Sequence, residues 1–158
     1  MSHEILHNVS FLKFLITAKQ NTYAGGGHMT ISSRSGSKDL GYQEGPFKYL
    51  DTYLGDVNFI GEEAVWYEDK PVWGMNYYGR MLVEQIPSGF SECLKSALLE
   101  VPEEMPFRGP EEFVEGDFSY NCSVEGSIEW FRGKEFIFYK GQKIYQLYFH
   151  GGDIKSFN

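Results

Sequence analysis

Apolar side chains recur at helical spacing in two stretches of the chain. The first covers residues 3–19, where Ser2 is in position to cap a helix, and the second covers residues 87–101, where Ser88 is the expected cap. The apolar positions of the first stretch are Ile5, Leu6, Val9, Leu12, Phe14, Leu15 and Ile16. Those of the second are Phe90, Cys93, Leu94, Ala97, Leu98 and Val101. Each set forms a stripe on a helical surface, so the sequence predicts two helices that pack on a core.

Elsewhere the pattern changes to a period of two, which is typical of strands. Aromatic and polar positions alternate through residues 46–82, which we interpret as a hairpin region. They alternate again through residues 117–150, which we interpret as a meander with turns at residues 132–133 and 141–142. These patterns predict most of the sheet.

The remaining segments read as connections. Residues 32–45 are rich in serine and glycine, and residues 102–116 are rich in proline and glutamate. Together the elements predict an α+β fold: a mainly antiparallel sheet of about six strands, formed by the hairpin region and the C-terminal meander, and packed by two helices. A chain of 158 residues suits one domain spanning residues 1–158, and no internal repeat is evident.

Composition narrows the class of protein. Aromatic residues make up 17% of the chain, which favours a sheet with tyrosine-lined faces. The formal charge of −8 argues against direct nucleic-acid binding, which relies on clustered lysine and arginine. No apolar run approaches the ~20 residues of a membrane span, and the start lacks the pattern of a secretory leader. Cys93 and Cys122 have no metal or redox spacing, so we expect free thiols and a cytoplasmic location.

The stretch "HEILH", from His3 to His7, matches the H-E-x-x-H signature of zinc proteases. A zincin needs both histidines on one face of a stable helix, together with a third ligand. This copy lies next to the first residue, where helices fray, and no extended motif follows it. We therefore expect a polar first helical turn, no metal site and no cofactor.

Polar side chains that could act together are densest between Arg34 and Arg80. Alternation puts Tyr49, Asp51 and Tyr53 on one face of a strand, and it puts a carboxylate among aromatic rings on each face of the next strand. A carboxylate in such surroundings either finds a partner or has its pKa raised. The candidate ligand-binding residues are Tyr49, Asp51, Tyr53, Glu62, Glu63, Trp66, Trp73, Asn76 and Tyr77.

Two runs of sequence carry a resemblance. The run "GSKDLGYQEGPFKYLDTYLGDVNFIGEEAVWYEDKPVWGMNYYGRML" and the later "GKEFIFYKGQKIYQLYFHGGDI" resemble an uncharacterised bacterial family, a domain of unknown function. Its members occur alone or follow XRE-type helix-turn-helix segments in proteins labelled as transcriptional regulators. The resemblance implies a sensory or accessory role and brings no established activity.

Three functions remain open from the sequence. The first is binding of a small polar or cationic molecule in an aromatic and acidic pocket. The second is a protein-interaction or homodimerisation module, because tyrosine and tryptophan are also enriched at interfaces. The third is a hydrolase-like enzyme that uses Glu62 or Glu63 as general acid or base, with Asp51 or His150 nearby.

Overall fold

The computed structural model describes residues 2–157, with side chains from Glu4 onward, and these residues form three helices and eight strands. The helices are α1 (Ser2–Leu6), α2 (Val9–Gln20) and α3 (Phe90–Leu99). The strands are β1 (Lys38–Glu44), β2 (Phe47–Gly55), β3 (Asn58–Tyr67), β4 (Lys70–Met81), β5 (Glu112–Glu115), β6 (Phe118–Ser127), β7 (Trp130–Tyr139) and β8 (Gln142–Asp153).

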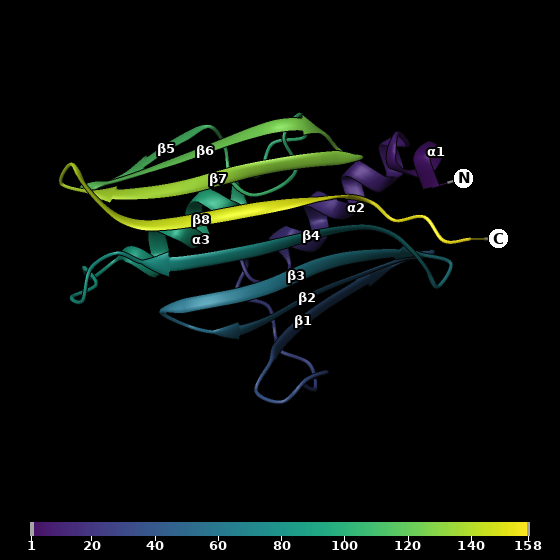
Figure 1. The fold of residues 1–158 in the computed structure, drawn as a ribbon, viewed down its shortest axis with the longest axis horizontal. Helices are drawn as coiled ribbons and strands as arrows, with labels where there is room; N and C mark the ends of the chain where they lie inside the picture. The colour runs from purple at the N-terminus through teal and green to yellow at the C-terminus, as the bar shows by residue number, and fades with distance from the viewer. Residues whose placement is uncertain (1, 158) are drawn as a thin grey trace.

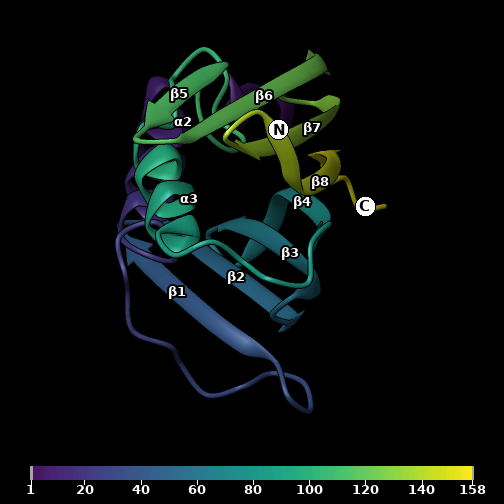
Figure 2. The same ribbon diagram turned by 90° about the vertical axis from the view of Figure 1, so that its left-hand side faces the viewer.

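All described strands belong to one antiparallel sheet with the order β1-β2-β3-β4-β8-β7-β6-β5. Two four-stranded meanders are therefore joined along β4 and β8, and α3 connects them in sequence (Figure 1). The sheet is strongly curved, and α2 and α3 lie on its concave side (Figure 2). The core fills the space between the helices and this concave face.

The predicted six strands packed by two helices are wrong, since the described chain has eight strands and is mostly sheet. The two strands that the pattern missed, β1 and β5, lie at opposite edges of the sheet. Strand β1 contains Gly41 and many polar residues, and β5 has only 4 residues, so side-chain propensity is weak in both. Both strands form because their backbones pair with β2 and β6.

Two local predictions also need correction. The predicted helix over residues 3–19 is broken at Asn8, whose side chain accepts a hydrogen bond from the Ser10 amide and caps α2. The predicted turn at residues 132–133 lies inside β7. Gly133 is needed there for another reason, because a Cβ at this position would come within 2.2 Å of the Phe149 ring.

The two meanders are structural repeats of each other, contrary to the expectation of no internal repeat. The motif G-x-E-x-[VI]-x-Y occurs at residues 61–67 in β3 and again at residues 133–139 in β7. The strand registers shift at the same place in both copies, between Val65 and Trp66 and between Ile137 and Phe138. The tight turns after these strands use positive φ angles at equivalent positions as well.

The side-chain packing around the repeated motif is also similar in the two meanders. A Cβ on Gly61 would clash with the Tyr77 ring, just as one on Gly133 would clash with Phe149. Tyr77 and Phe149 are equivalent residues, and they face each other in the β4–β8 pairing. A pseudo-twofold axis therefore passes between them, at the centre of the sheet. The repeat is hard to see in the sequence because identical pairs, such as Tyr49 and Tyr120 or Glu63 and Glu135, are separated by positions that differ in size or polarity.

Candidate functional site

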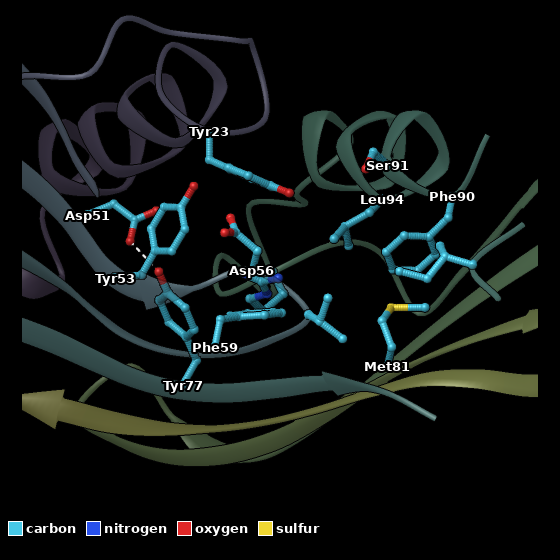
Figure 3. Close-up of a pocket in the computed structure, with 13 residues that line it drawn as sticks. Tyr23, Asp51, Tyr53, Asp56, Phe59, Tyr77, Met81, Phe90, Ser91 and Leu94 are labelled. Atoms are coloured by element: carbon cyan, nitrogen blue, oxygen red, sulfur yellow. Dashed lines mark hydrogen bonds between the residues drawn. The ribbon is translucent and has the colours of Figure 1, made fainter. Parts of the chain in front are cut away.

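A cavity of about 280 Å³ lies between α3 and strands β2–β4, on the concave side of the first meander. One end is polar and is formed by Tyr23, Asp51, Tyr53, Asp56, Tyr77 and Arg108. The other end is apolar and includes Phe59, Met81, Phe90 and Leu94. Figure 3 shows the two ends separated along the cavity, with Asp51, Tyr53 and Tyr77 grouped away from Phe90 and Met81. The volume is close to the lower limit of ordinary small-molecule pockets, ~300 Å³.

Strand alternation and one glycine position the polar end. Tyr49, Asp51 and Tyr53 point inward from β2, as the period of two predicted. Tyr53, Gly61 and Tyr77 follow one another across β2, β3 and β4. Because Gly61 has no side chain, the Tyr77 ring lies over β3, and its hydroxyl donates a hydrogen bond of 2.5 Å to Asp51 Oδ1.

Two buried ion pairs flank the cavity. Lys19 Nζ donates to Glu63 Oε1 at 2.6 Å and to the Phe107 carbonyl at 2.8 Å, and Tyr49 also donates to Glu63. The Arg108 guanidinium forms a two-point pair with Glu135, with Nε–Oε2 and Nη2–Oε1 distances of 3.0 and 2.8 Å. Glu63 and Glu135 are 3% and 0% exposed, so each acid needs its own cation inside the protein.

Asp51 is different from these paired acids. It is 6% exposed, and within the described chain its carboxyl accepts a hydrogen bond from Tyr77 alone. Burial, and then the nearby negative charge of Glu63, raise the pKa of Asp51 from its ordinary 3.8 to about 7. The hydrogen bond from Tyr77 and the positive charges of Arg108 and Lys19 act in the opposite direction. Asp51 therefore exchanges a proton close to neutral pH.

The positions of the second meander that correspond to this cavity hold different side chains. Glu135 keeps the tyrosine partner that Glu63 has, since Tyr120 is equivalent to Tyr49. Cys122 and Phe149, however, replace Asp51 and Tyr77. In the second meander, the ring of Phe107 occupies the space that corresponds to the cavity. That ring lies with centroid distances of 4.1 Å to Phe131 and 6.3 Å to Phe149, the equivalents of Phe59 and Tyr77. The Asp51–Tyr77 pair and the open cavity thus occur together in the first meander.

The structure brings together five of the nine predicted ligand-binding residues. Asp51, Tyr53 and Tyr77 line the cavity, while Tyr49 and Glu63 line an adjoining hollow of about 30 Å³. That hollow is the size of one water molecule.

The other four predicted residues lie elsewhere. The strand registers place Glu62, Trp66 and Asn76 on the convex face of the sheet, and Trp73 is a fully buried core residue whose Nε1 donates to the Ile128 carbonyl. His150 pairs with Asn76 and is exposed on the convex face, so it cannot act together with Glu63.

Sequence reasoning missed Tyr23 and Arg108. Both lie in irregular segments whose side-chain directions no periodicity predicts. Phe90 and Leu94 were placed on the inward stripe of the second helix, but nothing in that stripe distinguishes a residue that lines a cavity from one that fills the core.

The zinc-protease signature does not form a zincin helix. Helix α1 ends at Leu6, so His7 lies beyond it, and the side chain of His3 falls outside the described residues. His7 contacts Glu129. Among the residues that the structure describes, no three His, Cys, Asp or Glu side chains are grouped to hold a metal ion.

The strand order and the cavity define this chain as a mostly-sheet antiparallel protein with three short helices in the described residues, and not as the α+β fold that the sequence predicted; its cavity lies on the concave face of the first of two related meanders. The chain belongs to the family described as Domain of unknown function (DUF5680), whose model matches residues 51–154. The match covers both meanders from the middle of β2 onward. Searches of curated proteins and of solved structures found no match. No helix within residues 2–157 is long and apolar enough to cross a bilayer.

Proposed function

We propose that this domain binds a small organic molecule in the cavity between α3 and strands β2–β4. The polar group of the ligand contacts Asp51, Tyr53 and Tyr77, and its apolar part lies against Phe59 and Phe90. Apolar walls with a few converging polar groups are the usual composition of such pockets.

The comparison of the two meanders carries this proposal. At the equivalent place the second meander has the packed rings of Phe107 and Phe149, whereas the first meander has an open cavity that a buried carboxyl reaches. A cavity and a desolvated acid both destabilise a protein, so their retention at one place favours a functional explanation.

The test is a thermal-shift screen of a metabolite library against the wild type and two variants of α3. Ser91→Trp places a large ring in the cavity lining, whereas Glu92→Trp places the same ring on the exposed surface next to it. A ligand at one hundred times its Kd stabilises the folded state by about 2.7 kcal/mol. We expect stabilising compounds to act on the wild type and on Glu92→Trp and to lose their effect on Ser91→Trp. Equal shifts in all three proteins, or no shift with any compound, would contradict the proposal.

A second candidate function rests on the convex face. Ile60, Tyr78 and Tyr148 are neighbours across β3, β4 and β8, and they are 53%, 42% and 55% exposed. Such a row of large side chains suits a homodimer or another protein interface. Sedimentation of the wild type and of Tyr148→Lys tests this: a dimer that the lysine dissociates supports it, and two monomeric proteins contradict self-association.

We also propose a cytoplasmic, regulatory setting. The resemblance to domains that follow helix-turn-helix segments supports a sensory role, in which ligand binding is the signal. The free, buried thiols of Cys93 and Cys122 suit a reducing compartment.

A further inference from the structure

The charges buried beside the cavity do not balance. Lys19 neutralises Glu63, and Arg108 neutralises Glu135, through the contacts given above. Asp51 is the fifth charged group of this cluster, and both cations already bond to other carboxylates. An ionised Asp51 therefore leaves the described cluster one positive charge short.

We propose that the ligand of this cavity is an organic monocation, an amine or quaternary ammonium compound with an apolar body, whose charge is bound by Asp51. This inference rests on the proposed function and specifies the ligand class for the same site. Among the acids of this cluster in the described structure, Asp51 alone lines the cavity, and it has no cation partner there. A bound cation supplies the missing positive charge at Asp51.

The other charged groups near the cavity do not supply that charge. Lys38 from β1 pairs with Asp56 at the exposed rim, where the Asp56 side chain is 77% exposed. Lys95 of α3 lies over the Tyr23 ring and is partly exposed, so water screens it. Asp51 thus faces the cavity with no lysine or arginine bonded to it in the described structure.

The aromatic walls suit a cation as well. The rings of Tyr23 and Tyr53 meet edge to face with centroids 6.2 Å apart, and both border the cavity with Tyr77. Lys38 Nζ lies 5.5 Å from the Tyr53 ring centroid, and Lys95 Nζ lies 5.5 Å from that of Tyr23. The protein's own ammonium groups therefore already contact these rings in the manner that a cationic ligand uses.

The apolar end of the cavity limits the charge and the size of the rest of the ligand. Phe59, Met81, Phe90 and Leu94 offer no partner for a second charge, which argues against polyamines. A volume of about 280 Å³ admits one ring or a short chain beside the ammonium group. An anion would meet Asp51 and Asp56 in the lining, and Arg108 is already held by Glu135.

Binding of a cation is then linked to loss of a proton. Burial, and then Glu63 from β3, raise the pKa of Asp51, whereas Tyr77 from β4, Arg108 and Lys19 from α2 lower it, and the balance lies near neutral pH. Below that point Asp51 is protonated and holds a cation poorly. With a pKa of about 7, the ionised fraction of Asp51 falls about tenfold between pH 8 and pH 6, and affinity for a monocation follows it.

The experiment compares three probes of similar size by calorimetry: 2-phenylethylammonium chloride, 2-phenylethanol and sodium phenylacetate. We expect the ammonium compound to bind at least tenfold more tightly than the alcohol at pH 8, and phenylacetate to bind more weakly still. The advantage of the ammonium compound should shrink about tenfold at pH 6, while the alcohol changes little. Asp51→Asn should lose the preference for the ammonium compound, and the matched variant Asp69→Asn, at an exposed carboxylate outside the cavity lining, should retain it.

The contrary outcomes are distinct. Tighter binding of the alcohol or of phenylacetate, or an unchanged preference in Asp51→Asn, overturns the monocation while leaving a small-molecule pocket in place. Absence of binding by the ammonium compound at millimolar concentration also overturns it. The proposed function itself is judged separately, by whether the library compounds distinguish Ser91→Trp from Glu92→Trp.

Discussion

Replacing Asp51 by asparagine should make the protein more stable, and increasingly so as the pH rises. Asparagine has nearly the same shape and keeps an oxygen that can accept the Tyr77 hydrogen bond. It removes the ability to ionise and replaces the second carboxyl oxygen by an amide NH2 group. Because the amide does not titrate, the pH-dependent part of the effect isolates the free energy of holding a charged Asp51 in this buried position.

The magnitude follows from the pKa of Asp51. In the unfolded chain this carboxyl ionises near its ordinary 3.8, whereas in the folded protein it ionises near 7. Between these values the folded state holds a proton that the unfolded state has lost, so the stability of the wild type falls as the pH rises. At ~1.4 kcal/mol for each pH unit, a difference of about three units amounts to about 4 kcal/mol. The loss is absent below pH 3.8 and complete above about pH 7.

The assay is urea unfolding of the wild type and Asp51→Asn at intervals between pH 4 and pH 8. We expect the stability advantage of the variant to grow by up to about 4 kcal/mol across this range. Asp56→Asn is the control, because the Asp56 side chain is 77% exposed and should show no such trend. A difference between Asp51→Asn and wild type that stays constant with pH would refute the account of Asp51 as a desolvated acid.

The variant Tyr77→Phe tests the pKa of Asp51 in a second way. The Tyr77 hydroxyl lowers the pKa of Asp51 by donating to it, so its removal should raise that pKa further. The pH range over which stability is lost should then extend above that of the wild type. A range that does not move would show that Tyr77 and Asp51 are not coupled.

Three further predictions concern the repeated architecture. Arg108→Met should destabilise the protein by about 3–5 kcal/mol in urea unfolding because it leaves Glu135 charged and buried, whereas Arg132→Met, at an exposed pair, should cost less than about 1 kcal/mol. Gly61→Ala and Gly133→Ala should each lower the free energy of unfolding by about 1–3 kcal/mol, because each added methyl group clashes with an aromatic ring. A large difference between the two variants would contradict the equivalence of the two meanders. Phe107→Ala should cost about 3–5 kcal/mol by opening a cavity in the second meander, and added benzene should recover part of the lost Tm if that cavity is dry.

Several features of this protein follow from local sequence alone. Alternation along β2 predicted that Tyr49, Asp51 and Tyr53 share one face of the strand. The helical stripe predicted that Phe90 and Leu94 share the inward face of α3. These predictions succeed because side-chain direction depends on backbone geometry within a few residues. Edge strands escaped the same reasoning, because β1 and β5 are stabilised by pairing with a neighbour and not by their own side chains.

Tertiary structure decided which of the similar residues form a site. Glu63 and Asp51 look alike in sequence, but packing of α2 brings Lys19 to Glu63 and leaves Asp51 with a tyrosine hydroxyl. Likewise the rings of Phe59 and Phe131 occupy equivalent positions, but Phe107, from the connection between α3 and β5, packs on Phe131, whereas Phe59 borders the cavity. Charge pairing and cavity filling depend on distances between segments far apart in the chain, and the order of residues along one strand does not specify those distances.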